Sequence, residues 1–345
     1  MESHGVSRRR LLQAAGSALA GTFLAGSVLS GAAGLGGCAS SGQRTAGGKG
    51  DRRRVTRLAH LTDLHIQPER GAGEGVAQCL RAVQAMPDRP SMVLTGGDLV
   101  MDAYDQEETR TREVFDVLTG VLESDCGLPV KHTLGNHDIW GWNRPKSGMT
   151  GAEPLYGKAY AIDRLGMSGA YHHFDVGAGP GSWRVIVLDS VRPSREPGSI
   201  GYEAFLEPEQ FDWLKRTLAD TPKDRWVMLC SHVPIVSVAA ALSPSPPRPM
   251  TVSTSLMHAD ARELRDLFLK HPAVKLAVAG HLHERETLAY DGVTYACAGA
   301  VCGAWWKGRH KRCDEGYSTI DLFDDGSFDM AYHTYGWKAR EEAPA

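Results

Sequence analysis

Apolar runs of strand length recur along the chain, and five of them end in a polar turn. Each of the five is rich in apolar residues and stops at Asp, Asn or His. Short apolar runs bounded by turn residues are typical of buried strands. The five runs occupy residues 55–65, 91–98, 130–138, 225–234 and 274–283. A further strand is predicted at 183–190, and residues 318–333 predict a hairpin that turns at Asp325 and Gly326.

Segments with a helical period lie between these strands. In the segment that holds Val114, Leu118 and Val121, apolar side chains recur three and four positions apart. The predicted helices occupy residues 73–86, 107–124, 207–220 and 259–271. Alternating strands and amphipathic helices indicate an α/β fold. Ligands of such folds bind beyond the carboxyl ends of the strands, so we expect the polar turns to converge on one site.

Two long segments interrupt this alternation. Residues 139–173 are rich in Trp and Tyr, and residues 237–258 are rich in Pro and Ser. Loops of this length in a compact domain are usually functional lids or disordered insertions. Both segments are therefore candidates for a part in function.

Composition places the chain among ordinary globular proteins. It has 345 residues, of which 42% are hydrophobic and 23% charged, enough for one large domain or two smaller ones. Its formal net charge is −3. A protein whose main task is to neutralise a nucleic-acid backbone would be basic, so no nucleic-acid polymer is expected as a partner.

The N-terminus has the pattern of an export signal. The sequence SRRRLLQ is followed by a Gly/Ala-rich apolar stretch at 14–35 and then by LGGCAS. Arg8 and Arg9 resemble a twin-arginine signal. Residues 35–38 resemble a lipobox, which would leave Cys38 lipid-modified at the mature N-terminus. A single transmembrane anchor is the alternative, although Gly and Ser interrupt the stretch often.

These features predict four regions and a location. The regions are an export signal at 1–38, a flexible linker at 39–54, a folded domain at 55–337 and a tail at 338–345. The linker is predicted because its Gly, Ser and charged residues cannot form a core. The expected partners are the twin-arginine export machinery and the membrane, and the expected location is the periplasm or cell envelope of a bacterium.

Six cysteines remain beyond Cys38, and their state stays open. An even number in an exported chain is compatible with disulfides. Against this, Cys230 lies inside an apolar run, as a buried thiol would.

The polar turns carry residue types that bind metals. Asp63 and His65 are two residues apart, so on an extended segment their side chains would leave the same face and share one ion, and the same holds for His281 and His283. Asp98 follows two glycines, and a carboxylate with two oxygens can bridge two cations. The remaining candidate ligands are Asn136 and His232. Mixed oxygen and nitrogen donors suit Fe, Mn or Zn.

The order of these motifs resembles a known family. D-x-H, G-D, G-N-H-D, S-H-x-P and G-H-x-H follow one another from residue 55 to about residue 290, as in the calcineurin-like metallophosphoesterase superfamily. The resemblance implies a four-layer α/β/β/α sandwich with two mixed β-sheets and two metal ions at the strand ends.

The resemblance also implies a role for each residue. Asp63, His65 and His283 would hold the first metal, Asp98 would bridge, and Asn136, His232 and His281 would hold the second. His137 would stay unligated and meet the substrate as the catalytic residue. The implied reaction is hydrolysis of a phosphoester by a metal-bridging hydroxide, with His137 protonating the leaving oxygen or stabilising its charge.

The chain differs from several subfamilies at their motif residues, and these differences show which subfamily it resembles. Met101 stands where purple acid phosphatases have a tyrosine, and the arginine that follows this motif in protein phosphatases of the calcineurin type is missing. Asp102 lies one position later than their aspartate. Too few residues follow His283 for the extra domain of the nucleotidases. The chain thus resembles the exported, cyclic-nucleotide-phosphodiesterase-like branch, with AGAVCGAWWKG at 298–308.

Aromatic residues give the only indication of substrate. Trp140 and Trp142 follow His137 closely, which predicts that at least one ring contacts the substrate and favours diesters or nucleotide-like esters over small phosphates. The alternative is that both rings pin the loop to the core. Of Trp305 and Trp306, one is expected in the core, and a substrate role for either stays open.

Three functions remain compatible with the sequence. The favoured one is an exported dinuclear phosphoesterase acting on a small-molecule phosphoester, with phosphodiester hydrolysis preferred. A phosphomonoesterase is the first alternative. A lipid-anchored, non-catalytic binding protein on the same fold is the second.

Overall fold

A computed structural model of the chain describes residues 43–44, 52–196, 198–242 and 251–340. The predicted export signal, including Arg8, Arg9 and Cys38, lies outside these residues. No helix in the described part of the chain is long and apolar enough to cross a membrane.

Two six-stranded sheets form the centre of the fold. The first sheet comprises, in spatial order, β1 (Gln43–Arg44), β14 (Phe328–Thr334), β13 (Gly316–Phe323), β2 (Arg54–Leu61), β3 (Met92–Thr95) and β4 (Val130–Lys131). The second comprises β11 (Arg285–Tyr290), β12 (Val293–Ala298), β10 (Val274–Ala279), β9 (Trp226–Ser231), β6 (Trp183–Leu188) and β5 (His172–Val176). A separate hairpin pairs β7 (Val191–Pro193) with β8 (Tyr202–Ala204). Both large sheets contain parallel and antiparallel pairs, as the resemblance implied.

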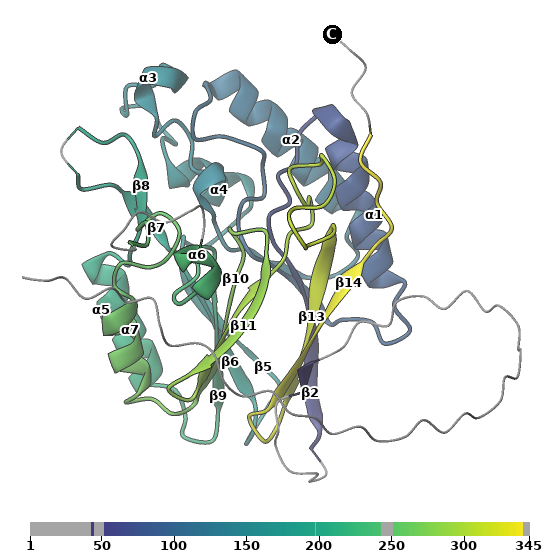
Figure 1. The fold of residues 1–345 in the computed structure, drawn as a ribbon, viewed down its shortest axis with the longest axis vertical. Coiled ribbons are helices and arrows are strands. Elements are labelled where there is room, and N and C mark those ends of the chain that lie inside the picture. The colour runs from purple at the N-terminus through teal and green to yellow at the C-terminus, as the bar shows by residue number, and fades with distance from the viewer. Residues whose placement is uncertain (1–42, 45–51, 197, 243–250, 341–345) are drawn as a thin grey trace, which may run out of the picture. The chain divides into compact units, whose positions relative to one another are not determined.

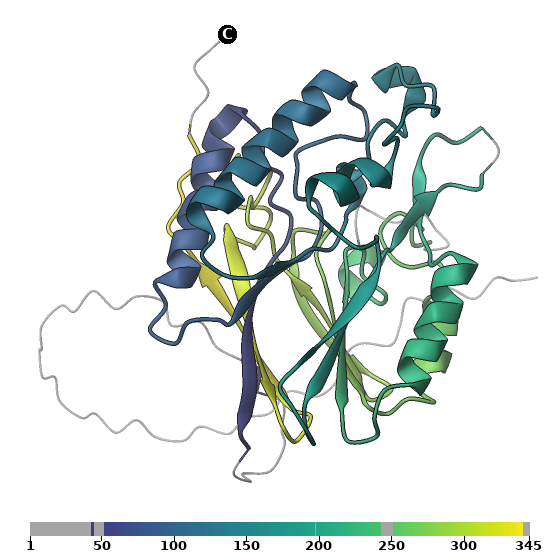
Figure 2. The same cartoon turned by 180° about the vertical axis from the view of Figure 1, so that it is seen from behind.

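Helices cover the outer face of each sheet (Figures 1 and 2). The longer ones are α1 (Ala72–Gln84), α2 (Glu108–Asp125), α4 (Lys158–Arg164), α5 (Pro208–Ala219) and α7 (Ala261–Phe268). Shorter turns are η1 (Glu69–Gly71), η2 (Asn136–Asp138), α3 (Arg144–Ser147) and α6 (Val238–Ala241). The predicted helices at 73–86, 107–124, 207–220 and 259–271 correspond to α1, α2, α5 and α7 and are confirmed.

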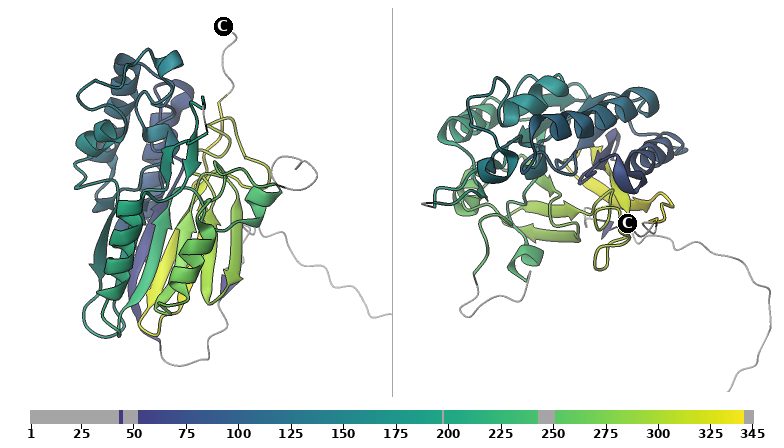
Figure 3. Two further views of the ribbon diagram at one scale, coloured as in Figure 1. Left: turned by 90° about the vertical axis from the view of Figure 1, so that its left-hand side faces the viewer. Right: turned by 90° about the horizontal axis from the view of Figure 1, so that it is seen from above.

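The alternation of side chains along β2 shows why four layers form. Ala59 and Leu61 face α1 and α2 and belong to the core beneath these helices. Leu58 points the other way and packs with Val185 and Met228 of the second sheet. A third core lies between the second sheet and α5 and α7. The order helix, sheet, sheet, helix is visible from the side in Figure 3 and confirms the predicted α/β/β/α sandwich.

Parallel pairing brings the strand ends to one edge. β2 runs parallel to β3 and β3 to β4, while β9 runs parallel to both β6 and β10. The carboxyl ends of these strands therefore point in the same direction within each sheet, and the loops that follow them gather at the top of the view in Figure 1.

The aromatic segment 139–173 contains short elements of regular structure rather than forming one structureless loop. It contains α3, α4 and the start of β5. Tyr160 of α4 is 5% exposed, with its ring centroid 5.3 Å from those of Phe115 and Trp140. This segment adds to the helical layer over the first sheet.

Three structural features lie near the predicted region boundaries. Strand β2 begins at Arg54, one residue before the predicted start of the domain. Within the predicted linker, Gln43 and Arg44 pair with Met330 and Asp329 as β1. Arg340, in the predicted tail, forms an ion pair with Glu74 of α1.

All six cysteines beyond Cys38 are free thiols. Burial raises the pKa of several of them, to about 12 for Cys230, so they are protonated at neutral pH. The buried-thiol interpretation therefore holds for five of the six, while Cys126 is half-buried.

Candidate metal centre

The seven predicted ligands all follow the ends of parallel strands. Asp63 and His65 follow β2, and Asp98 follows β3. The other four follow β4, β9 and β10; they are Asn136, His232, His281 and His283. The structure brings these residues from five strands of two sheets to one place, as the strand-end pattern predicted.

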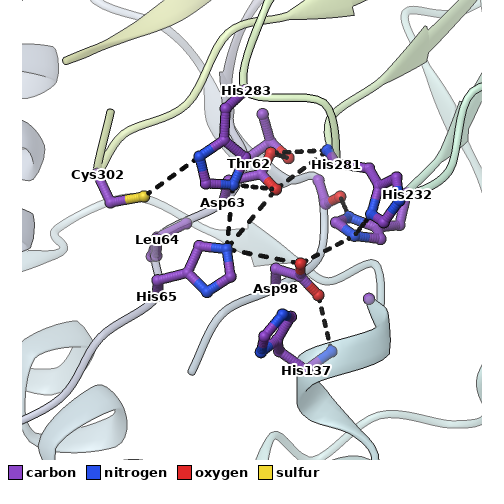
Figure 4. Close-up of polar contacts among 12 residues, drawn as sticks. Thr62, Asp63, Leu64, His65, Asp98, His137, His232, His281, His283 and Cys302 are labelled. Atoms are coloured by element: carbon purple, nitrogen blue, oxygen red, sulfur yellow. Dashed lines mark hydrogen bonds and ion pairs between the residues drawn. The ribbon is translucent and has the colours of Figure 1, made fainter. Parts of the chain in front are cut away.

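Asp63, His65 and His283 form a first group of donors (Figure 4). His65 Nε2 lies 3.1 Å from His283 Nε2, and His283 Nε2 lies 3.3 Å from Asp63 Oδ1. Separations near 3 Å are what donor atoms show when they share one ion with bonds of about 2 Å. All three side chains are buried.

Asp98, His232 and His281 form a second group. His232 Nε2 lies 3.1 Å from Asp98 Oδ2 and 3.2 Å from His281 Nδ1. The same Asp98 oxygen lies 3.6 Å from His65 Nε2 in the first group. Asp98 is thus within reach of both groups, which is the position that a bridging carboxylate needs.

The backbone at the ligands differs from the extended conformation that the sequence predicted. Asp63 and His65 have φ values of 54° and 41°, and His281 and His283 have φ values of 68° and 51°. These are left-handed conformations, uncommon for residues with a side chain and found most often at functional sites. The prediction of an extended segment was wrong, although each pair does converge on the site.

Two glycines allow the close approach of the ligand loops. A Cβ atom on Gly135 would lie 2.2 Å from Asp98 Oδ1, and one on Gly280 would lie 1.9 Å from Thr62 Oγ1 and 2.3 Å from Asp63 Oδ2. Any side chain at either position would therefore displace a ligand. This explains physically why the G-N-H-D and G-H-x-H motifs begin with glycine.

Backbone carbonyl groups orient two of the imidazole rings. His232 Nδ1 donates to the Gly96 carbonyl oxygen at 2.8 Å, and His283 Nδ1 donates to the Gly303 carbonyl oxygen at 2.5 Å. A proton fixed on Nδ1 leaves the Nε2 lone pair directed into the site. These two Nε2 atoms are the ones that lie 3.1 to 3.3 Å from the other donor atoms.

The charges of the site favour cation binding. Burial disfavours the charged form of His232, but the Asp98 carboxylate outweighs burial and raises the pKa of His232 to about 9. Burial also disfavours the ionised form of Asp98, yet His232 holds the pKa of Asp98 well below its usual value. Burial, together with the neighbouring His232, lowers the pKa of His281 to about 4. A cation that replaces the proton on His232 would meet an ionised carboxylate and neutral imidazole donors.

One buried polar atom fits a metal ion because it lacks any partner. Asn136 Oδ1 makes no hydrogen bond with the described residues. Such orphaned atoms are costly in a folded protein unless an ion or water satisfies them. The donor set of imidazole nitrogens and carboxylate or amide oxygens matches Fe, Mn or Zn.

His137 lies at the edge of both donor groups. Its backbone N–H donates to Asp98 Oδ1 at 2.9 Å, and its ring centroid is 4.7 Å from that of His65. The ring is half-buried, and Nδ1 lies 3.9 Å from Asp102 Oδ1, a contact that the displaced position of Asp102 had left in doubt. A donor atom of His137 also lies within 4.8 Å of donor atoms of His65 and Asp98. Geometry alone therefore permits His137 as a proton donor or as a ligand.

Asp138 has a structural role that the sequence did not reveal. Its carboxylate accepts hydrogen bonds from the backbone N–H groups of Leu99, Val100 and Gly135 at 2.7, 3.2 and 2.8 Å. These bonds join the loop after β3 to the loop after β4. Burial and the nearby Asp98 carboxylate raise the pKa of Asp138 to about 7. Two of the partners, Leu99 and Val100, are distant in sequence, so no local signal could have identified the link between the two loops.

The tryptophans near His137 differ in their surroundings. Trp140 is 2% exposed and packs in the core beside Tyr160, so its ring is not available to a substrate. For Trp140 the prediction of a substrate contact was wrong, and the core alternative holds. Trp142 is half-buried, with its ring 6.3 Å from that of Tyr104 and beneath the Lys158 ammonium group.

Trp305 and Trp306 have separate environments, as the sequence predicted. Trp306 is fully buried and its Nε1 donates to the carbonyl oxygens of Leu64 and His65 at 3.1 and 3.0 Å. Trp305 is half-buried, with its ring centroid 4.5 Å from that of His283. They lie in a turn rather than on a strand.

Two further residues beside the first donor group were not singled out from the sequence. Thr62 Oγ1 donates to Asp63 Oδ2 at 2.6 Å, and Cys302 Sγ lies 3.9 Å from His283 Nδ1. Thr62 immediately precedes the D-x-H motif, which could have signalled its role. Cys302 offered no such signal, because a lone cysteine in an apolar segment is usually only packed.

Comparisons with known proteins identify a family of phosphoesterases. The family model described as calcineurin-like phosphoesterase matches residues 56–285. The chain is 24% identical over 80% of its length to a probable cyclic nucleotide phosphodiesterase of Synechococcus sp., covering 91% of that protein. It is 25% identical over 78% of its length to the 3',5'-cyclic adenosine monophosphate phosphodiesterase CpdA of Pseudomonas aeruginosa, covering 86% of that protein.

A solved structure shares the fold. A dimetal phosphatase from Danio rerio superimposes with a TM-score of 0.53 at 14% sequence identity. The match covers 81% of this chain and 100% of that chain.

Proposed function

The chain belongs to the calcineurin-like phosphoesterase family, and on that basis we propose that it is an exported phosphodiesterase that uses two metal ions to hydrolyse nucleotide-like esters. Family membership makes it a metal-dependent phosphoric ester hydrolase rather than the non-catalytic binding protein considered above. Beyond family membership, we propose the number of metal ions, the class of ester that is hydrolysed and the location of the protein.

The position of Asp98 carries the proposal of two ions. Its Oδ2 atom lies 3.1 Å from His232 Nε2 and 3.6 Å from His65 Nε2, each in a different donor group. Asp63, His65 and His283 would hold one ion, and Asn136, His232 and His281 the other. When bound, such ions lower the pKa of a water molecule and neutralise phosphoryl oxygens.

The protein's own groups would orient the substrate and move protons. The Asp98 side chain fixes the loop that carries His137, because its Oδ1 accepts from the His137 backbone N–H at 2.9 Å. The half-buried His137 imidazole is placed to give a proton to the oxygen of the leaving group. Its Nδ1 lies 3.9 Å from Asp102 Oδ1, beyond hydrogen-bond distance, and has no hydrogen-bond partner among the described residues.

Two observations support a diester as the substrate. The names of two relatives, given above, include cyclic nucleotide phosphodiesterase activity. Among the described residues, Trp305 places a half-buried aromatic ring 4.5 Å from that of His283. Aromatic rings favour the planar groups of nucleotide-like esters.

The test is a substrate screen on purified protein loaded in turn with Mn, Zn and Fe. We expect turnover of bis(p-nitrophenyl) phosphate and 3',5'-cyclic AMP to exceed that of p-nitrophenyl phosphate. The metal-free protein is the control and should be inactive. A consistent preference for the monoester would replace the phosphodiesterase proposal with the phosphomonoesterase alternative.

The location is proposed from the N-terminal sequence alone. Arg8 and Arg9 and the lipobox-like residues 35–38 support export by the twin-arginine machinery and lipid attachment at Cys38. A bacterial periplasm or cell envelope would then be the site of action.

A further inference from the structure

A short turn between Gly303 and Gly308 covers the first donor group. The turn is tied to the ligands at several points: His283 Nδ1 donates to the Gly303 carbonyl oxygen at 2.5 Å, and the Cys302 backbone N–H donates to the Asp63 carbonyl oxygen at 3.2 Å. Any side chain that the turn presents is thereby held close to the metal ligands.

Trp306 anchors this turn. Its ring is fully buried, and a Cβ atom on Gly75 of α1 would lie 2.2 Å from it, so the ring fits tightly against the helix. Its Nε1 hydrogen bonds reach the backbone of Leu64 and His65. Trp306 therefore explains how the turn is held in place, and Trp305 is not needed for that purpose.

Trp305 occupies an unfavourable backbone conformation. Its φ value is 52°, and that of Trp306 is 66°. A bulky residue in the left-handed region is a genuine outlier, persisting only where its surroundings enforce it and most often at functional sites. The strain at Trp306 is offset by the core that it fills. Trp305 is half-buried and fills no comparable core.

The aromatic neighbours of Trp305 in the described structure are all imidazole rings, and two of them belong to predicted metal ligands. Ring centroids lie 4.5 Å away for His283, 5.7 Å for His310 and 5.9 Å for His65. The His65 ring is also 4.7 Å from His137. A phosphoester bound at the donor groups, with its ester oxygen near His137, would have its organic part within reach of the Trp305 ring.

We propose that Trp305 forms the face on which a planar organic group of the phosphoester, such as a nucleobase, stacks. This rests on the proposed function and names the residue that selects the substrate class. Trp140 is excluded by burial, and Trp142 packs with Tyr104 and Lys158 and has no imidazole ring among its described ring contacts. Stacking on an aromatic side chain requires only a planar face and tolerates different bases.

The test compares two ligands that differ only in the base. Binding of AMP and of ribose 5-phosphate to the Mn²⁺-loaded protein is measured by calorimetry. We expect AMP to bind about 5- to 150-fold more tightly to the unmodified protein, the usual range for one stacked base. In Trp305→Gly the two ligands should bind equally, with the affinity for ribose 5-phosphate unchanged within about twofold. Trp305→Phe should retain part of the preference.

Stability separates a substrate contact from a structural role. Glycine adopts a φ value of 52° without strain, and this relief offsets the entropy that glycine adds to the unfolded chain, so the metal-free Trp305→Gly protein should unfold at a similar temperature. Trp213→Ala, a half-buried tryptophan on α5 with its ring 4.9 Å from that of Tyr171, is the control and should keep the base preference.

Three results would overturn the proposal. They are equal affinities of the unmodified protein for AMP and ribose 5-phosphate, a preference for AMP that survives in Trp305→Gly, and a loss of affinity in that variant that is the same for both ligands. Failure of the proposed function would look different. The protein would turn over no diester, while calorimetry would still detect the base-dependent binding.

Discussion

The backbone N–H of His137 donates a hydrogen bond of 2.9 Å to Asp98 Oδ1. The other oxygen of the same carboxylate faces His232 and His65. One side chain therefore sets both the distance between the donor groups and the position of the loop that carries His137. Asp98 therefore links both donor groups to the loop that carries His137.

This link predicts a combined defect in Asp98→Ala. The purified protein should contain close to two metal ions per chain, and the variant should lose both metal affinity and activity, because both donor groups lose their shared oxygen. Metal content is measured by mass spectrometry of the dialysed protein, with Asp116→Ala, an exposed carboxylate on α2, as the control. One ion per chain at full activity would contradict the dinuclear assignment.

His137→Ala tests whether that residue is a proton donor or a ligand. As a general acid it should lower turnover by about 10²- to 10⁴-fold while metal content stays near normal. The measurement pairs kcat with metal analysis of the same sample. A substrate with a good leaving group, such as bis(p-nitrophenyl) phosphate, should suffer less than 3',5'-cyclic AMP, since p-nitrophenolate leaves without protonation. Loss of metal from the variant would instead identify His137 as a ligand.

The convergence of the site could be predicted because it depends on local patterns. Each apolar run marked a strand, each strand ended in a donor residue, and parallel pairing then required the donors to meet. Asp98 and His232 illustrate this, since they are far apart in sequence and their side chains lie 3.1 Å apart. The family resemblance supplied the grouping of the ligands and the four-layer fold.

The remaining features depend on contacts that a sequence pattern does not record. The left-handed φ of Asp63 arises where the chain leaves β2 and passes under Gly280, which has no side chain to obstruct it. Asp138 looked like an ordinary turn residue, and its three backbone partners come from two separate loops. Trp140 and Trp305 are the same residue type, and only tertiary packing buries one and half-exposes the other.

The N-terminal pattern predicts the route of export. Arg8 and Arg9 resemble the signal of proteins that cross the membrane already folded. Crossing in the folded state suits an enzyme that acquires its metals before release. Replacing Arg8 and Arg9 with Lys should leave precursor in the cytoplasm, as measured by fractionation and immunoblotting. Normal processing of that variant would contradict the route.

Cys38→Ser tests the lipid independently of the route. If Cys38 is the lipid attachment site, the variant should no longer fractionate as a lipid-modified membrane protein, and labelling with a fatty-acid analogue should disappear. A product that stays in the membrane without the label would identify an uncleaved anchor. The Arg8 and Arg9 variant then shows whether that anchor still follows the same export route.

The buried His60 predicts a specific loss of stability in acid. His60 is fully buried between the sheets, with Nε2 3.7 Å from Cys230 Sγ and Nδ1 without a partner among the described residues. Burial lowers its pKa to about 4, against 6.5 in an unfolded chain. The unfolded state therefore binds the proton more readily, so the stabilisation by neutral His60 is complete above pH 6.5 and is lost as pH falls from 6.5 through 4.

His60→Gln removes this titration while keeping a polar side chain of similar size. Relative to the variant, the unmodified protein should lose about 2 to 3 kcal/mol of unfolding free energy between pH 7.5 and pH 4.5, since one pKa unit corresponds to about 1.4 kcal/mol. Urea unfolding of both proteins in the presence of a chelator gives the difference, in which the titration of the metal-binding histidines largely cancels. A stability difference that stays constant over this pH range would show that His60 is protonated or hydrated in the folded state, and that the space between the two sheets is less dry than its apolar lining implies.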